Sequence, residues 1–160
     1  MAQYQCARTT WTPTATADNA LETANGHESY IAGAAPAIAR VNEVMEGGEA
    51  TSSTVNVMAL RRHSTASATP TAKTPAKLNP SSGANVGTYH QTATTQPTTS
   101  TGTHVLNLSL NVFGGIVRWV AAPGQEIYLV GGSTGNNELG LSAVSGTPGA
   151  LSSHLIVEEL

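Results

Sequence analysis

The residues GGSTG, from Gly131 to Gly135, match the G-x-S-x-G pattern that surrounds the nucleophilic serine of many hydrolases. Glu138 and His154 follow in the order that the acid and the base take in that class. The pattern requires a helix directly after the serine, but the next residues are two asparagines and then Gly140, which is typical of a loop. The three polar residues also span only 22 positions, too few for intervening strand–helix units. We therefore expect no catalytic residues and no enzymatic activity.

Few residues of this chain are suited to bind a metal ion or a cofactor. The five histidines, at positions 27, 63, 90, 104 and 154, include no pair at i, i+2 or i, i+4 spacing. Cys6 is the only cysteine and Asp18 the only aspartate, so a disulfide, a cysteine-based zinc site and a calcium loop all lack their ligands. Distant histidines that meet around a metal stay an alternative. We expect no metal and no cofactor.

Several aromatic and basic residues are candidates for contact with a protein partner. Arg61 and Arg62 are adjacent and form the densest positive point of the chain. Trp11 stands just before Pro13, outside any clear strand pattern, so it is expected to dock into a pocket of its own domain or of a neighbouring subunit. The predicted partner contacts are Tyr4, Trp11, Arg61, Arg62 and Tyr89.

Composition indicates a β-protein with long loops. The 160 residues suffice for one domain, charged residues make up only 11%, and serine and threonine together number 36. The net charge of −3 argues against a basic nucleic-acid-binding protein. The two halves of the chain differ in charge, and this asymmetry favours contacts with proteins over contacts with nucleic acid. The longest nearly apolar run, 114–123, contains Arg118 and is too short to span a bilayer. The first ten residues lack the basic and apolar blocks of a signal peptide, so we expect a soluble protein made in a cytoplasm.

Strand patterns lie at both ends of a polar middle. Residues 36–61 are predicted to form a β-hairpin, with a turn at the glycine pair 47–48 and the polar residues after it. Residues 105–111 (VLNLSLN) alternate most regularly, with three leucines inward, and further strands are predicted at 116–121, 126–130 and 151–159. Trp119 and Tyr128 are expected to pack in the core. Residues 131–149 read as a glycine-rich loop, and 18–28 as one short helical turn at most.

These patterns predict an all-β chain with an antiparallel β-sandwich or jelly-roll-like fold. We expect an extended N-terminal arm at 1–17 and a single sandwich domain at 18–160. Residues 64–103 are rich in threonine and proline, and are expected to be a long extended loop laid along the domain or a neighbour, with disorder as the alternative.

The order of these features resembles a loosely defined group of small tailed-phage virion proteins. The residues that carry the resemblance are the start MAQYQ, Arg40-Val41-Asn42-Glu43, the NPSSGAN loop, Gln96-Pro97-Thr98, the run GGIVRWVAAPGQEIYLV and the final HLIVEEL. The glycine-rich loop at 131–149 is longer than this group would suggest. The resemblance implies a structural β-sandwich without catalytic residues that coats or completes a virion.

The resemblance therefore predicts a capsid decoration (cement) protein that bridges neighbouring major capsid subunits on the outer surface of a bacteriophage virion. Cement proteins use many modest contacts, and a chain with few large apolar residues gains from sharing an interface, so we expect a homotrimer or other cyclic oligomer. The expected partners are the major capsid protein and the chain itself, with no nucleic acid, membrane or small-molecule substrate. Two alternatives remain open: a tail, neck or fibre-associated virion protein, and a glycan-binding adhesin module.

Overall fold

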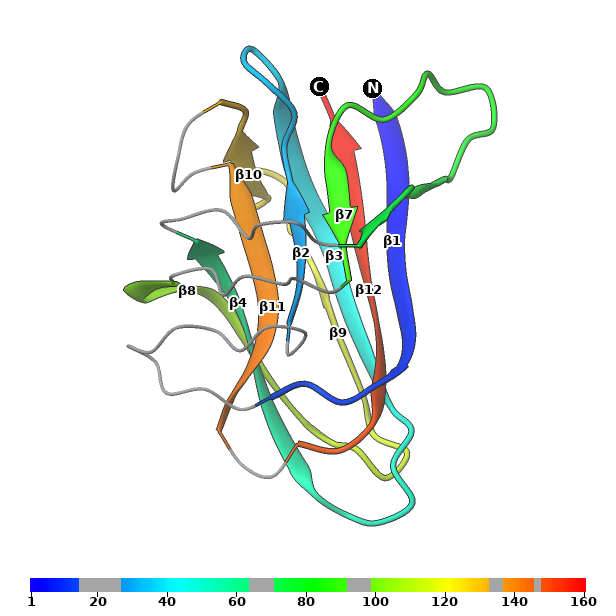
Figure 1. Cartoon of the computed structure of the whole chain (residues 1–160), viewed down its shortest axis with the longest axis vertical. Coiled ribbons are helices and arrows are strands. Elements are labelled where there is room, and N and C mark those ends of the chain that lie inside the picture. The colour runs from blue at the N-terminus through cyan, green and yellow to red at the C-terminus, as the bar shows by residue number, and fades with distance from the viewer. Residues whose placement is uncertain (15–26, 64–70, 92–98, 133–136, 146–147) are drawn as a thin grey trace.

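The chain folds into two six-stranded antiparallel sheets that enclose one core, as seen in a computed structural model (Figure 1). The structure describes residues 1–14, 27–63, 71–91, 99–132, 137–145 and 148–160, without the side chains of 99–103 and 145. Sheet I contains, in spatial order, β10 (Ile127–Val130), β3 (Ile38–Gly48), β12 (Leu151–Glu159), β1 (Ala2–Trp11) and β6 (Ala76–Lys77), and β9 (Ile116–Val120) also pairs with β3. Sheet II contains β5 (Ala72–Lys73), β7 (Thr88–His90), β2 (His27–Ile31), β11 (Glu138–Ser145), β4 (Val55–His63) and β8 (Thr99–Asn111).

The prediction of an all-β sandwich is confirmed. Strand alternation builds its core, because every second side chain of a strand points to the same face of the sheet. Leu151, Leu155 and Val157 of β12 are buried on the inner face of sheet I. Leu108 and Leu110 of β8 are buried on the facing side of sheet II, as the alternation in the sequence predicts. β12 also has the predicted bounds.

The first residues differ from the expected arm. Residues 2–11 form β1, which lies between β12 and β6 in sheet I and pairs with β12 from Ala2 opposite Glu159 to Trp11 opposite Leu151. Little in the sequence indicates this strand, because its inward apolar residues Tyr4, Cys6 and Trp11 have polar neighbours and the two-residue spacing is broken before Trp11. The strand is specified by its long-range partner, not by its own pattern.

The predicted hairpin at 36–61 has its strands in the right places but the wrong pairing. β3 belongs to sheet I and β4 to sheet II, so residues 49–54 cross between the sheets. The mixed pattern of β3 comes from a β-bulge: Val41 pairs with Val157 and Glu43 with Ile156, which leaves Asn42 as the extra residue. The bulge changes which alternate residues face the core, so Val41 and Val44 are both buried.

Two of the four unpredicted strands of sheet II are β2 and β11. β11 lies within the expected glycine-rich loop and is a central strand between β2 and β4. Its residues are small or mixed in polarity, and Gly140 sits opposite Ser29 and Arg61, so no clean alternation marks it. β2 begins at His27, and the rest of the expected helical turn at 18–28 lies outside the described residues. Tyr128 also differs from expectation, since it is 41% exposed, whereas Trp119 packs against the core.

The expected long loop at 64–103 is partly ordered into short strands. Residues 71–91 run along the domain: β5 pairs with β7 in sheet II, and β6 pairs with β1 in sheet I. We call residues 72–77 the strap, because they bridge the two sheets along one open side of the sandwich. β8 begins at Thr99, before the predicted residue 105. Residues 64–70 and 92–98, including the Gln96-Pro97-Thr98 step, lie outside the described part.

Candidate functional site

Four side chains form a hydrogen-bonded chain between the two sheets. Glu28 of β2 points from sheet II toward sheet I and is completely buried. Its carboxylate accepts hydrogen bonds from Tyr89 Oη of β7 and from Ser153 Oγ of β12, the latter at 2.5 Å. Ser153 Oγ in turn accepts a hydrogen bond from Trp11 Nε1 at 3.1 Å. Strands β1, β2, β7 and β12 are thus tied together by one polar network inside an apolar core, which we call the inter-sheet network.

The charge of this network is set by burial and by one arginine. Burial raises the pKa of Glu28, while the hydrogen bonds from Ser153 and Tyr89 and the Arg8 guanidinium act in the opposite direction. Arg8 lies 4.5 Å above the Trp11 ring and donates to the carbonyl oxygen of His27 at 3.3 Å. It therefore balances the buried carboxylate at the end of β1.

A second buried glutamate lies beside this network. Glu46 of β3 is opposite Ser153 on the inner face of sheet I, is completely buried, and has no hydrogen-bond partner for either carboxylate oxygen. Burial, together with the nearby charge of Glu28, raises the pKa of Glu46 to about 8. A buried carboxyl without a partner is stable only in its neutral form, so the folded chain holds a proton at Glu46 near neutral pH.

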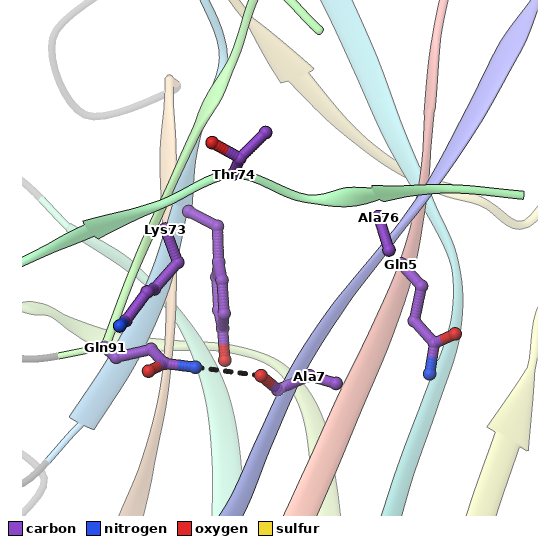
Figure 2. A pocket seen from close by; sticks show the side chains of 7 residues that line it. Gln5, Ala7, Lys73, Thr74, Ala76 and Gln91 are labelled. Carbon is purple, nitrogen blue, oxygen red and sulfur yellow. Dashed lines mark hydrogen bonds between the residues drawn. The ribbon is translucent and has the colours of Figure 1, made fainter. Parts of the chain in front are cut away.

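A cleft opens beside the inter-sheet network, on the side of the sandwich that the strap crosses. It has a volume of about 420 Å³ and is lined by Gln5, Ala7, Lys73, Thr74, Ala76, Tyr89 and Gln91. Figure 2 shows the strap passing above β1, with Gln91 Nε2 donating to the carbonyl oxygen of Ala7 at 2.8 Å. Tyr89 is only 1% exposed and its hydroxyl is bonded to Glu28, so it is a wall of the cleft and not an open contact.

Three of the five histidines gather on the face of sheet II that is turned away from sheet I. The rings of His27 and His63 meet edge to face at 5.6 Å, and His63 Nδ1 lies 3.1 Å from Glu138 Oε1. Burial lowers the pKa of His90, while Glu138 opposes and His27 adds to this effect. Across the described ranges, no group of three or more His, Cys, Asp or Glu side chains is arranged to hold a metal ion.

The hydrolase-like pattern has no assembled triad among the described residues. Ser133 and its neighbours to residue 136 lie outside the described part. Glu138 contacts His63 in sheet II, whereas His154 lies in sheet I, where its Nε2 is 3.2 Å from Glu43 Oε1. The glutamate and the histidine thus have different partners, in different sheets.

The five predicted partner contacts have mostly internal roles. Tyr4, Trp11, Arg61 and Tyr89 are between 0% and 4% exposed, and Trp11 packs in its own domain. Tyr4 Oη donates to the carbonyl oxygen of Gly83, and Arg61 donates to that of Ala143. Arg62 is half-buried and donates to the carbonyl oxygen of Tyr128 at 2.7 Å. Of the five, Arg62 keeps part of its side chain open to a partner, whereas the other four are enclosed in this chain.

The outer face of sheet I combines paired charges with exposed apolar side chains. Its central charges are paired with each other: Arg118 with Glu43 at 2.7 Å, and Arg40 with Glu158 at 2.9 Å. Apolar side chains lie along its border, on β9, β10 and the adjoining end of β3. They are Ile38, Ile116, Val120, Tyr128 and Val130, each between 39% and 75% exposed, and we call them the apolar border.

Sequence reasoning missed Glu28, Glu46 and Ser153. Glu28 and Tyr30 stand at alternate positions of β2, but the strand is only five residues long, too short to stand out in the sequence. Glu46 follows Val44 at an inward position of β3 that reads as apolar, so the alternation itself marks it as an exception. Ser153 carries no comparable signal.

Comparison with known proteins identifies no family for this chain. No protein-family model matches the sequence, and no curated protein matches it. In the described part of the chain, no helix has the length and apolar character needed to cross a membrane.

Proposed function

We propose that this chain is a structural virion protein of a tailed bacteriophage, and specifically a capsid decoration protein that bridges neighbouring major capsid subunits. It would be made in the host cytoplasm and act on the outer surface of the capsid. The observation that carries the proposal is the outer face of sheet I, where the charges are paired internally and the apolar border is left exposed. The order of sequence features described above supports the same role.

The apolar border has the character of a contact surface for another protein. Ile38 and Val130 are directly opposite each other on β3 and β10, and Leu160, which donates its N–H to the carbonyl oxygen of Ile38 at 3.0 Å, extends this end of the sheet. They are 39%, 47% and 52% exposed. Because the neighbouring arginines already have carboxylate partners, docking here removes apolar surface from water without stranding a charge.

The buried polar network between the two sheets supports a structural role. Both oxygens of the Glu28 carboxylate are bonded to groups of the chain itself, and the Tyr89 hydroxyl belongs to the same network. These groups hold the two sheets together. We propose no catalysis and no cofactor.

The decisive measurement is the copy number of this chain in purified particles, by quantitative mass spectrometry against the major shell protein. A ratio near one, or a simple fraction of it, is expected. A ratio of a few per cent would assign the chain to the tail, neck or fibre instead. Complete absence from particles would refute the virion role, and a glycan array would then test the adhesin alternative.

A paired set of variants tests the surface. The double variant Ile38→Lys/Val130→Lys places two charges at the apolar border and is expected to reduce binding to capsids strongly. Leu78→Lys, at a position 44% exposed near the strap, is the control and should bind as the parent chain does. Equal binding of both variants would exclude the apolar border as the docking surface.

A further inference from the structure

The two sheets end in strands whose outer edges differ in how they are protected. An edge strand offers unpaired N–H and C=O groups to any other chain, and natural proteins block such edges with charges, proline or covering groups. At the side of the strap, β5 and β6 are two residues long, and carry Lys73 and Lys77 on either side of Pro75. At the opposite side of sheet I, β9 carries Arg118, and Arg62 binds the carbonyl oxygen of Tyr128 on β10.

In the described part of the chain, β8 shows none of these protections. It is the last strand of sheet II, and among the described residues only β4 pairs with it (Figure 1). It is 13 residues long, and its sequence from Thr99 to Asn111 contains no proline, lysine, arginine, aspartate or glutamate. A long, uncharged edge of this kind is suited to pair with another strand.

A short part of β8 is nearly palindromic. Residues 106–110 read Leu-Asn-Leu-Ser-Leu, so the pattern is nearly the same in both directions about Leu108. Leu108 and Leu110 are buried on the inner face, while Asn107 and Ser109 are exposed on the outer face. Two antiparallel copies of this strand would place leucine beside leucine on the core side and Asn107 beside Ser109 on the solvent side.

We propose that the outer edge of β8 binds β8 of a second copy of this chain, antiparallel and about a two-fold axis at Leu108. The six strands of sheet II then continue into the six of the second copy, with both leucine rows on the same side. No like charges meet, because residues 105–111 carry none. A two-fold interface of this kind closes on itself, so the product is a dimer and not the trimer expected from the sequence.

The proposal is independent of the virion role, since it concerns only this chain. Sedimentation of the purified protein should give twice the mass of the 16.3 kDa chain. Amides of residues 105–111 should become more protected from hydrogen exchange as protein concentration rises. A monomer at the highest soluble concentration, or a trimer, would overturn the proposal.

Two double variants test the register. Asn107→Lys/Ser109→Lys places lysine opposite lysine of the second copy, whereas Asn107→Lys/Ser109→Glu places lysine opposite glutamate. Both positions are exposed, so circular dichroism and the urea midpoint should show that both variants fold. The dissociation constant should rise about tenfold or more in the first variant and return toward the parent value in the second.

Each result bears on a different part of the proposal. A dimer that the lysine pair does not weaken has its interface elsewhere, which would refute the assignment to β8. A dimer weakened equally by both double variants would refute the register about Leu108. Copy number on virions has no influence on either outcome.

Discussion

The protonation state of Glu46 changes the stability of the fold with pH. The carboxyl is completely buried without a partner, and its pKa rises from 4.5 to about 8 on folding. Because the pKa is higher in the folded chain, the neutral form is favoured by folding. The contribution of neutral Glu46 to the free energy of unfolding is complete below about pH 4.5 and is lost as the pH rises through about 8. One pKa unit corresponds to ~1.4 kcal/mol, so the loss is about 3 kcal/mol at pH 7 and about 5 kcal/mol at high pH.

The variant Glu46→Gln removes this dependence, because glutamine has nearly the same shape and does not ionise. We expect its free energy of unfolding, relative to the parent chain, to increase by about 3 kcal/mol between pH 4.5 and pH 7 and to level off above about pH 8. Urea unfolding followed by tryptophan fluorescence at a series of pH values measures this difference. Any fixed cost of burying the amide shifts the whole curve without changing its slope.

Glu49→Gln is the matched control, because Glu49 is an exposed glutamate three residues further along the chain. Because it also removes one carboxylate from the same part of the chain, comparison of the two variants isolates the effect of the buried position. The titration of Glu28 contributes to parent and variant alike, so it largely cancels in the comparison. A difference in the free energy of unfolding between Glu46→Gln and the parent chain that does not change with pH would refute the reasoning, since Glu46 would then ionise equally in the folded and unfolded chains.

Two further predictions concern packing and acid stability. Gly48→Ala would place its Cβ 2.3 Å from the carbonyl oxygen of Val112, so it should destabilise the fold by about 2–3 kcal/mol or more in urea unfolding, whereas Gly83→Ala, with nothing within 4 Å, should cost little. The Arg118 guanidinium lowers the pKa of Glu43 to about 2, so the stability from this pair is present above pH 4.5 and lost as pH falls toward 2. Arg118 is 57% exposed, so water screens this pair and the loss of stability should be small, and NMR titration of Arg118→Ala should show the Glu43 pKa return toward 4.5.

The sequence predicts the strands that have a regular two-residue alternation, but it does not predict which strands they pair with. β12 and the leucine row of β8 could be predicted because inward leucines alternate with polar residues. β1 and β11 could not, since their alternation is weak and both are held by long-range neighbours on either side. The turn after β3 looked like a hairpin, but a local turn signal does not reveal whether the chain crosses to another sheet.

The candidate functional sites were harder to predict from the sequence than the strands. Buried polar groups such as Glu28 and Ser153 come from strands far apart in the sequence, and only the packing of the two sheets brings them together. Tyr89, predicted as a partner contact, is buried and its hydroxyl donates to Glu28, whereas Trp11 docks in its own domain, which is one of the two predicted alternatives. The exposed border on β9 and β10 followed from strand order, which the sequence does not specify.

The pairing of β1 with β12 has a consequence for how the chain reaches this fold. β1 (Ala2–Trp11) takes its main partner from β12 (Leu151–Glu159), so this pair of strands in sheet I forms only after the residues between them have been made. Closing so long a stretch of chain is slow, because its entropy is lost before the contacts that repay it form. Until β12 is available, the edge of β1 that pairs with it is open to other nascent chains. During synthesis, β1 can therefore pair with a wrong strand before β12 is available.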